Sequence, residues 1–386
     1  MSAVVLRRLK RIDVGILIIL GLLMVISVLV VRSATYGNPM YPNYDLKQLI
    51  FYLAGFAVAI IATLFNYRFF LKYWYVWYGI GIALLVLVYF FGEERNNARS
   101  WFELPGGILF QPAELMKLLL IMAVAALLAR REGDPLSFRR DLVPIAAISL
   151  APFALVMIQP DLGNAVIYIV IVLGMLWIGR VKYWHVLIGV AVMVAGLLVF
   201  VTLFNTYNQE IEDFLRSNGK GHWYERINTY INPETASDDA KRQAKNALTA
   251  IGSGGLTGDG YMKGNMKNRR SIPYPYSDSI FVVIGEEFGF RGAAVLLLLY
   301  FLLIYRMIMI AFQCTDLSGS YIIVGIVSMF VFQIFENIGM MIGLMPITGI
   351  TLPFISYGGT SLLINMICIG LVFSIRAYQP EPEQTA

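Results

Sequence analysis

Charge, cysteine and histidine are scarce in this sequence. Asp, Glu, Lys and Arg together make up 14% of its 386 residues, and it has two cysteines and two histidines. His185 and His222 have no companion ligands nearby in the chain, which argues against a zinc site. Cys314 and Cys368 lie in or beside apolar runs, where cysteines usually pack as small apolar residues. So little charge excludes an ordinary soluble globular protein.

Apolar residues are correspondingly abundant: they make up 58% of the chain, and the mean hydropathy is +0.68. Several apolar runs reach the ~20 residues that cross a bilayer. Each span must be helical, because lipid cannot satisfy exposed backbone groups. The sequence therefore predicts an all-α integral membrane protein, a polytopic bundle of ten transmembrane helices with one large extracytoplasmic loop. The expected spans are about 13–32, 46–66, 71–91, 109–129, 143–160, 163–179, 184–204, 288–312, 320–344 and 355–377.

The basic residues predict how the chain is oriented in the membrane. The first apolar run lacks a small-residue cleavage pattern, so it is expected to be a helix rather than a removed signal peptide. With ten spans, the basic residues at the span ends all fall on one side, which places both termini in the cytoplasm. The net charge of +5 then orients the protein and does not indicate nucleic-acid binding. These residues are Arg7, Arg8, Lys10, Arg11, Arg68, Lys72, Arg130, Arg131, Arg139, Arg140, Arg180, Lys182, Arg306 and Arg376.

The opposite, outer side receives most of the glycine, proline and unpaired polar residues. We interpret the chain as one membrane domain, 1–386, whose large extracytoplasmic loop is about 205–287. The shorter outer pieces are 33–45, 92–108, 159–163 and 346–353. The working face is therefore expected outside the cytoplasm, where no ATP or nucleotide sugar is available.

Asp278 is the leading candidate for a reactive group. It follows a proline and tyrosine turn and precedes an apolar run, in the sequence YPYSDSIFVVIGEEFG. A carboxylate at the membrane surface can serve as a general base. Local pattern leaves an equal alternative, in which Ser277 or Asp278 is only the N-cap of a helix.

Three ionisable residues are candidates within or beside the spans. Glu114 and Lys117 are three residues apart, so they share one face of the fourth helix. They form either a structural ion pair or part of a site in which Lys117 contacts an anion. Asp161, in QPDLGNA, is either a second carboxylate of the site or a turn former.

Arginine and glycine residues of the outer pieces suggest contacts with an anion. Arg99 lies beside Trp101 and breaks the positive-inside trend, which an anionic ligand would explain. The glycines of 252–260 can form either a flexible turn, which we favour, or a phosphate cradle.

Further charged residues near the glycines are also candidates. A basic patch of Lys263, Lys267, Arg269 and Arg270 suits phosphates. The carboxylates Glu286 and Glu287 are either exposed acids at the interface or ligands of a cation. Glu336 lies deeper, and we expect it to join Gln333 and Asn337 in a polar network between helices.

Together these motifs resemble the SEDS family of bacterial cell-wall polymerases, the RodA and FtsW proteins. The resemblance covers nearly the whole chain, in the order and spacing of the family. The stretch FENIGMMIGLMPITGITLPF is more similar to the RodA, elongation-type branch. The matching motifs are ARSW, FQPAELMKL, QPDLGNA, AIGSGGLTGDG, SDSIFVVIGEEFGFRG and GLMPITGITLPFISYGGTS.

The resemblance implies a peptidoglycan glycosyltransferase that polymerises lipid II on the outer face of the plasma membrane during elongation. Asp278 matches the essential family aspartate, and Glu114, Lys117 and Asp161 match other polar motif positions. The residues around the aspartate depart from the family pattern. The family has Pro-Glu-x-x-Thr-Asp-Phe, whereas residues 273–279 of this chain read PYPYSDS. The geometry of that loop is therefore not transferred.

The implied reaction is an inverting displacement in which Asp278 takes the proton from the acceptor sugar hydroxyl. Lys117 and Arg99, with a divalent cation such as Mg or Mn as a further candidate, would stabilise the departing pyrophosphate. Glu114, Asp161, Lys263 and Arg269 complete the expected substrate site. The implied partners are a class B penicillin-binding transpeptidase and other membrane proteins of the elongation complex. The alternatives are a flippase for the same lipid-linked precursor and a structural scaffold.

Overall fold

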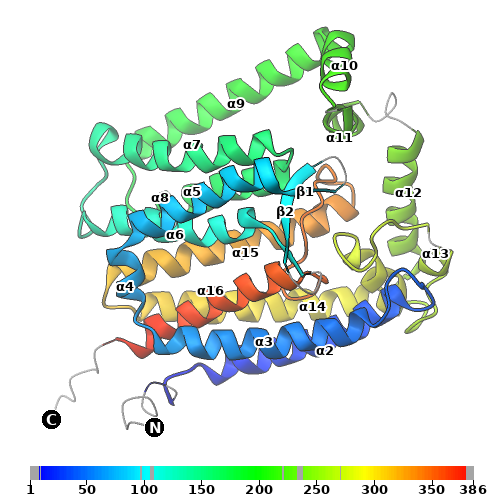
Figure 1. The fold of residues 1–386 in the computed structure, drawn as a ribbon, viewed down its shortest axis with the longest axis horizontal. Helices are drawn as coiled ribbons and strands as arrows, with labels where there is room; N and C mark the ends of the chain where they lie inside the picture. Colours follow the sequence, from blue (N-terminus) through cyan, green and yellow to red (C-terminus); the bar gives the residue numbers. More distant parts are fainter. Residues whose placement is uncertain are drawn as a thin grey trace.

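Long helices lie side by side in the computed structural model, which describes residues 8, 10–95, 98–104, 108–219, 221–232, 238–269 and 271–379 (Figure 1). Ten apolar helices among the described residues correspond to the ten expected spans; nine are long and apolar enough to cross a membrane, and α8 is shorter. They are α2 Val14–Thr35, α3 Tyr44–Leu64, α5 Trp74–Phe91, α6 Pro112–Ala129, α7 Val143–Ile158, α8 Leu162–Ile178, α9 Tyr183–Thr206, α14 Ile280–Phe312, α15 Leu317–Met341 and α16 Gly359–Ala377. The all-α membrane fold is confirmed.

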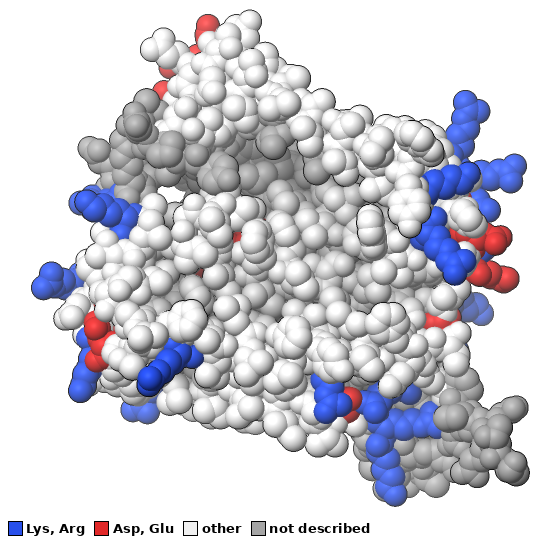
Figure 2. All heavy atoms as spheres, turned by 180° about the vertical axis from the view of Figure 1, so that it is seen from behind, with Lys and Arg blue, Asp and Glu red and all other residues white. Residues whose placement is uncertain are grey.

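The helices differ in how deeply they are buried. In α6 and α16, 72% and 78% of the apolar window is buried inside the protein, whereas none of the window of α9 is. Helix α9 runs obliquely away from the other helices, and the surface between α9 and the body is hollowed (Figures 1 and 2). Its apolar side chains, such as Trp184 and Leu198, are therefore exposed to the surroundings. Helices α6 and α16 form the centre of the bundle.

Charged side chains gather at the two ends of the molecule and leave a broad uncharged zone between them (Figure 2). At one end, Asp13 before α2 forms ion pairs with Arg376 of α16 and, at 3.7 Å, with Arg306 of α14. These two arginines were assigned to one side of the membrane from sequence, and the structure brings them together. The short helix α4, Tyr67–Lys72, lies at the same end of the bundle.

The opposite end, here called the loop end, carries a small sheet that the sequence did not predict. Strands β1 Glu93–Arg95, β2 Ala98–Leu104 and β3 Ile108–Phe110 pair antiparallel in that order. The expected outer loop 92–108 is thus mostly extended, and the fourth span begins at Pro112 rather than at 109. Pairing satisfies backbone groups that an irregular loop would leave to water.

Four further helices at the loop end lie within the expected large loop. They are α10 Asn208–Ser217, α11 Gly221–Ile231, α12 Asp238–Ser253 and α13 Asn265–Asn268 (Figure 1).

Before α7, residues Phe138–Leu142 form a short π-helix, η1.

Helix α14 begins at Ile280, eight residues before the expected span, so 280–287 is helix rather than loop. It kinks at Gly289, where φ is 62° and ψ is −159°. A Cβ atom at Gly289 would lie 2.5 Å from the Gly258 nitrogen, so only glycine permits this approach of the 254–260 turn. The turn packs directly on the kink.

Candidate active site around Asp278

Asp278 lies in the loop that leads into α14, at the loop end of the bundle. The N-cap of α14 is Ser279, whose backbone N–H donates to Asp278 Oδ1 at 3.0 Å. The alternative in which Ser277 or Asp278 is the N-cap is therefore wrong. Asp278 is half-buried, so its carboxylate remains accessible for chemistry.

Two structural contacts fix the backbone around Asp278. The Asn337 side chain, on α15, donates to the main-chain carbonyls of Asp278 at 2.8 Å and Ile350 at 2.7 Å. Ser356 Oγ donates to the Ser277 carbonyl at 2.6 Å. Because buried carbonyls are costly to leave unpaired, these bonds hold the Asp278 loop against the segment before α16.

That segment also connects Asp278 to the start of α8. Gly349 has a φ of 82°, and a Cβ added to it would lie 3.8 Å from Asp278 Oδ2. On the other side, a Cβ at Gly163 would lie 3.3 Å from Thr348 Cβ. Residues 348 and 349 are thus packed between the carboxylate and α8.

Asp161 both caps α8 and links it to the start of α6. Its Oδ1 accepts from the Asn164 backbone N–H at 3.1 Å, as an N-cap does. Its Oδ2 accepts from the side chains of Gln111 at 2.7 Å and Asn164 at 2.8 Å. The expected turn-forming role is confirmed, and a role toward substrate stays a prediction.

Glu114 and Lys117 form the expected ion pair on α6, with Lys117 Nζ 2.7 Å from Glu114 Oε1. The lysine is completely buried and the glutamate nearly so. Among the described residues, Lys117 has no other hydrogen-bond partner and Glu114 Oε2 has none. Buried polar groups are normally satisfied, so this pair has bonding capacity left for a ligand or water.

Glu336 is a further candidate for the site, although from the sequence we expected it only in a network with Gln333 and Asn337. Its Oε1 accepts from Thr348 Oγ1 at 2.8 Å, and it interacts electrostatically with Asp161 and Lys117. Glu336 is far from α6 and α8 in the sequence, so the sequence did not indicate that it lies near their residues.

Arg99 lies on the exposed surface of β2, at the loop end. The next residue, Ser100, donates from Oγ to the Gln159 carbonyl at 3.2 Å. This bond attaches β2 to the turn that precedes Asp161. Arg99 is thus held near the turn, and its contact with a ligand stays a prediction.

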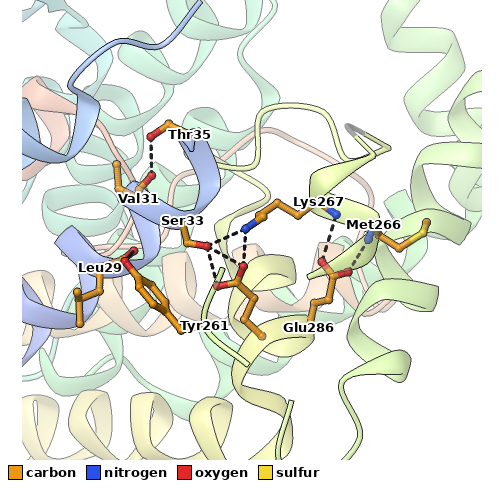
Figure 3. Close-up of polar contacts among 9 residues, drawn as sticks. Leu29, Val31, Ser33, Thr35, Tyr261, Met266, Lys267 and Glu286 are labelled. Atoms are coloured by element: carbon orange, nitrogen blue, oxygen red, sulfur yellow. Dashed lines mark hydrogen bonds and ion pairs between the residues drawn. The ribbon is translucent and has the colours of Figure 1, made fainter. Parts of the chain in front are cut away.

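The expected basic patch is only partly at the surface. Lys263 and Arg269 are exposed, and Arg270 lies outside the described residues. Lys267 is buried, and its Nζ donates to Glu287 Oε1 at 2.6 Å and to Ser33 Oγ at 2.8 Å (Figure 3). The prediction that Lys267 belongs to the surface patch is therefore wrong, because its charge is neutralised by an internal ion pair with Glu287.

Glu286 and Glu287 are buried as well, so of the two alternatives the one with exposed acids at the interface is wrong. Glu286 accepts from the backbone N–H groups of Met266 at 2.6 Å and Lys267 at 3.2 Å (Figure 3). Both carboxylates thus tie the 260–269 segment to α14. No cluster of three or more His, Cys, Asp or Glu side chains suited to a metal ion is found within the described ranges.

The glycine-rich turn uses its own amides internally. The Gly258 N–H donates to the Gly254 carbonyl at 2.7 Å, and the N–H groups of Asp259 and Gly260 donate to the carbonyls of Glu286 and Glu287, each at 3.0 Å. These amides are therefore occupied and cannot cradle a phosphate. The favoured interpretation as a turn is confirmed, but the turn is fixed by hydrogen bonds and by packing on α14.

The arrangement combines a half-buried carboxylate with a buried, incompletely bonded polar group. Asp278 is connected through 348–349 to Glu336, and Glu336 interacts with Asp161 and Lys117. A carboxylate can remove a proton, and a lysine can stabilise negative charge where water is scarce. This chemistry suits transfer to a hydroxyl from a substrate with an anionic leaving group.

Comparisons with known proteins match this chain over almost its whole length. Stage V sporulation protein E of Bacillus subtilis is 33% identical over 376 residues, covering 94% of each chain. The peptidoglycan glycosyltransferase RodA of Treponema pallidum is 30% identical, covering 86% of this chain and 90% of RodA. The identities to these two relatives, 33% and 30%, are too similar to decide to which branch of the family this chain belongs. Its assignment to the RodA branch therefore stays a prediction.

A solved structure extends the similarity to the fold. This structure describes the structural coordination of polymerization and crosslinking by a peptidoglycan synthase complex. Its matching chain is 28% identical in sequence and superposes with a TM-score of 0.77. The match covers 96% of this chain and 99% of that chain. The sequence model of the FtsW, RodA and SpoVE family, described as cell cycle proteins, matches residues 7–381 of this chain. This chain is therefore a member of the FtsW, RodA and SpoVE family, the SEDS family.

Proposed function

We propose that this protein is a peptidoglycan glycosyltransferase that polymerises lipid II into glycan strands, with Asp278 as the general base. The observation that carries the proposal is the match, over nearly the full chain, to relatives named as peptidoglycan glycosyltransferases. The position of Asp278 supports it, because a half-buried carboxylate at the loop end can reach a substrate held at the membrane surface.

In the proposed reaction, Asp278 removes the proton from the acceptor sugar hydroxyl. The hydroxyl oxygen bonds to the anomeric carbon of the donor sugar as the bond to the lipid pyrophosphate breaks. The configuration inverts, and the pyrophosphate leaves with the bonding electrons. No enzyme nucleophile is needed, because the acceptor hydroxyl displaces the pyrophosphate directly in a single inverting step.

The departing negative charge requires stabilisation, for which Lys117 and Arg99 are the proposed groups. The unfilled bonding capacity of Lys117 supports this role. Glu114 and Asp161 then position the lysine and the start of α6, and exposed Lys263 and Arg269 would contact the anionic substrate outside the membrane. A divalent cation, Mg or Mn, stays a proposal for which no protein ligand set is assigned.

We further propose that the loop end faces outward from the bacterial plasma membrane and that both termini are cytoplasmic. The gathering of basic residues with Asp13 at the opposite end supports this orientation. A class B penicillin-binding transpeptidase is the proposed partner, supported by the similarity to a chain of a polymerising and crosslinking complex.

The proposal is tested with purified full-length protein, fluorescent lipid II and a class B transpeptidase. Formation of glycan polymer, resolved by gel electrophoresis, supports a glycosyltransferase. A flippase would instead move lipid II across vesicle membranes without making polymer, and a scaffold would do neither.

A further inference from the structure

Five tyrosines gather beside the Asp278 loop, and we call them the tyrosine cluster: Tyr41, Tyr44, Tyr274, Tyr276 and Tyr357. Tyr41 comes from the loop between α2 and α3, and Tyr44 is the first residue of α3. Tyr274 and Tyr276 come from the loop before α14, and Tyr357 from the loop before α16. The rings of Tyr44 and Tyr357 are stacked, with centroids 4.3 Å apart and an angle of 19°. The Tyr276 ring lies 4.5 Å from Tyr41 and 5.2 Å from Tyr44.

The tyrosine cluster is fixed relative to Asp278. Tyr276 precedes the aspartate by two residues, and its carbonyl accepts from the Tyr357 N–H at 2.9 Å. Tyr274 has a φ of 46°, which is unfavourable for a residue with a side chain, and 45% of it is exposed. Strained residues that the surroundings hold in place are concentrated at functional sites.

A hollow of about 440 Å³ adjoins the cluster and shares Tyr41 with it. Its volume is within the range of small-molecule sites, roughly 300–1,000 Å³. Charged and amide side chains, Arg32, Asp45, Asn38 and Asn43, line it together with Pro39. Arg32 and Asp45 are 3.9 Å apart and partly exposed, so they pair loosely and can still bond a ligand.

The ligand that fits these features is a saccharide. Sugar rings present apolar C–H faces that pack on aromatic rings, and hydroxyls that bond to carboxylate, guanidinium and amide groups. A tyrosine hydroxyl is protonated at neutral pH and can donate a hydrogen bond; burial and then the neighbouring Tyr44 raise the pKa of Tyr357 further, to about 12. The hollow combines apolar faces, from Tyr36, Pro39 and Pro42, with charged and amide groups, a mixture that suits a sugar better than a purely apolar lipid chain.

We propose that the tyrosine cluster and the adjoining hollow bind the glycan strand outside the membrane and guide its sugar end toward Asp278. This inference rests on the proposed function. Tyr44 and Tyr357 stack on each other, half-buried Tyr41 lines the hollow, and Tyr274 is exposed. The strand would then stay bound between successive additions.

The test measures saccharide binding separately from catalysis. Full-length protein in nanodiscs is titrated with a lipid-free tetrasaccharide of alternating N-acetylglucosamine and N-acetylmuramic acid, and calorimetry gives Kd. We expect Tyr41→Ala to weaken binding about fivefold or more, because a ring contact is lost. Tyr41→Phe keeps the ring and should stay within about twofold of the wild type. Tyr183→Ala, at an exposed ring on the far end of α9, should leave Kd unchanged.

A second variant guards against loss of folding in Tyr41→Ala. Arg32 has a side chain that is 59% exposed, so Arg32→Ala should fold and still weaken binding. In polymerisation assays, both variants should release shorter glycan strands than the wild type. Absence of tetrasaccharide binding by the wild type, or equal Kd values for the wild type and both alanine variants, would overturn the inference. Failure of the wild type to polymerise lipid II would instead overturn the proposed function.

Discussion

Asn337, a buried residue near the C-terminal end of α15, donates a hydrogen bond of 2.8 Å to the main-chain carbonyl of Asp278. The same side-chain nitrogen lies 2.7 Å from the carbonyl of Ile350. One amide group therefore fixes the Asp278 loop and the segment before α16 at once. It couples the placement of the proposed base to the membrane helices.

Replacing Asn337 by Leu should lower both the stability of the protein and its activity. The change leaves two buried carbonyls unpaired, which costs about 1–3 kcal/mol each. A shift of the Asp278 loop by ~1 Å would lower polymerisation about a hundredfold. Thermal unfolding in detergent and lipid II polymerisation measure the two effects. Gln333→Leu, one turn away on α15, is the control and should retain most of the activity.

The Glu114 and Lys117 pair can be separated into structural and binding roles. Lys117→Met alone leaves the Glu114 carboxylate buried without its partner and should cost about 3–5 kcal/mol of stability. Adding Glu114→Gln removes that charge and should restore most of the unfolding temperature. If Lys117 stabilises the leaving group, the double variant folds but does not polymerise lipid II. An active, stable double variant would assign the pair to folding alone.

Lys267 and Glu287 should stabilise the loop that carries Asp278. Lys267→Met leaves the buried Glu287 carboxylate with only Ser33 Oγ as a hydrogen-bond donor among the described residues, at 2.6 and 2.7 Å. We expect a loss of about 3 kcal/mol, measured by thermal unfolding. The double variant Lys267→Met with Glu287→Gln should recover part of it. Lys263→Met, at an exposed lysine in the same segment, should change little.

Acid should weaken the opposite end of the bundle through Asp316. Burial acts to raise the pKa of Asp316, but hydrogen bonds from Ser318, Tyr67 and Arg68 outweigh it and hold that pKa below its ordinary value. A lowered folded-state pKa gives stability that is present above the unfolded pKa and lost as pH falls through the folded one. The unfolding temperature should therefore drop below about pH 4. Asp316→Asn should show a smaller drop, and an equal drop would contradict this origin.

Hydrophobic runs made the membrane fold predictable from sequence. Their lengths located ten helices, because a bilayer requires a minimum length of apolar helix. The start of α14 was missed because Glu286 and Glu287 looked like exposed acids. Only the structure shows that backbone amides and Lys267 satisfy them.

The candidate site was predictable only in part. The i,i+3 spacing predicted the Glu114 and Lys117 pair, because the two residues share one turn of helix. The hydrogen bond of Glu336 with Thr348 and its electrostatic interaction with Asp161 and Lys117 could not be predicted, since they depend on how α15 packs against α6 and α8. The tyrosine cluster likewise requires the start of α3 and three loops that are distant in the sequence to meet.

The most direct test of the central claim is polymerisation of fluorescent lipid II by the Asp278→Ala variant together with a class B transpeptidase. Asp213→Ala, at an exposed acid of α10, is the matched control. The proposed base predicts no polymer from Asp278→Ala at an unchanged unfolding temperature, and normal polymer from the control. Normal polymer from Asp278→Ala would contradict the account.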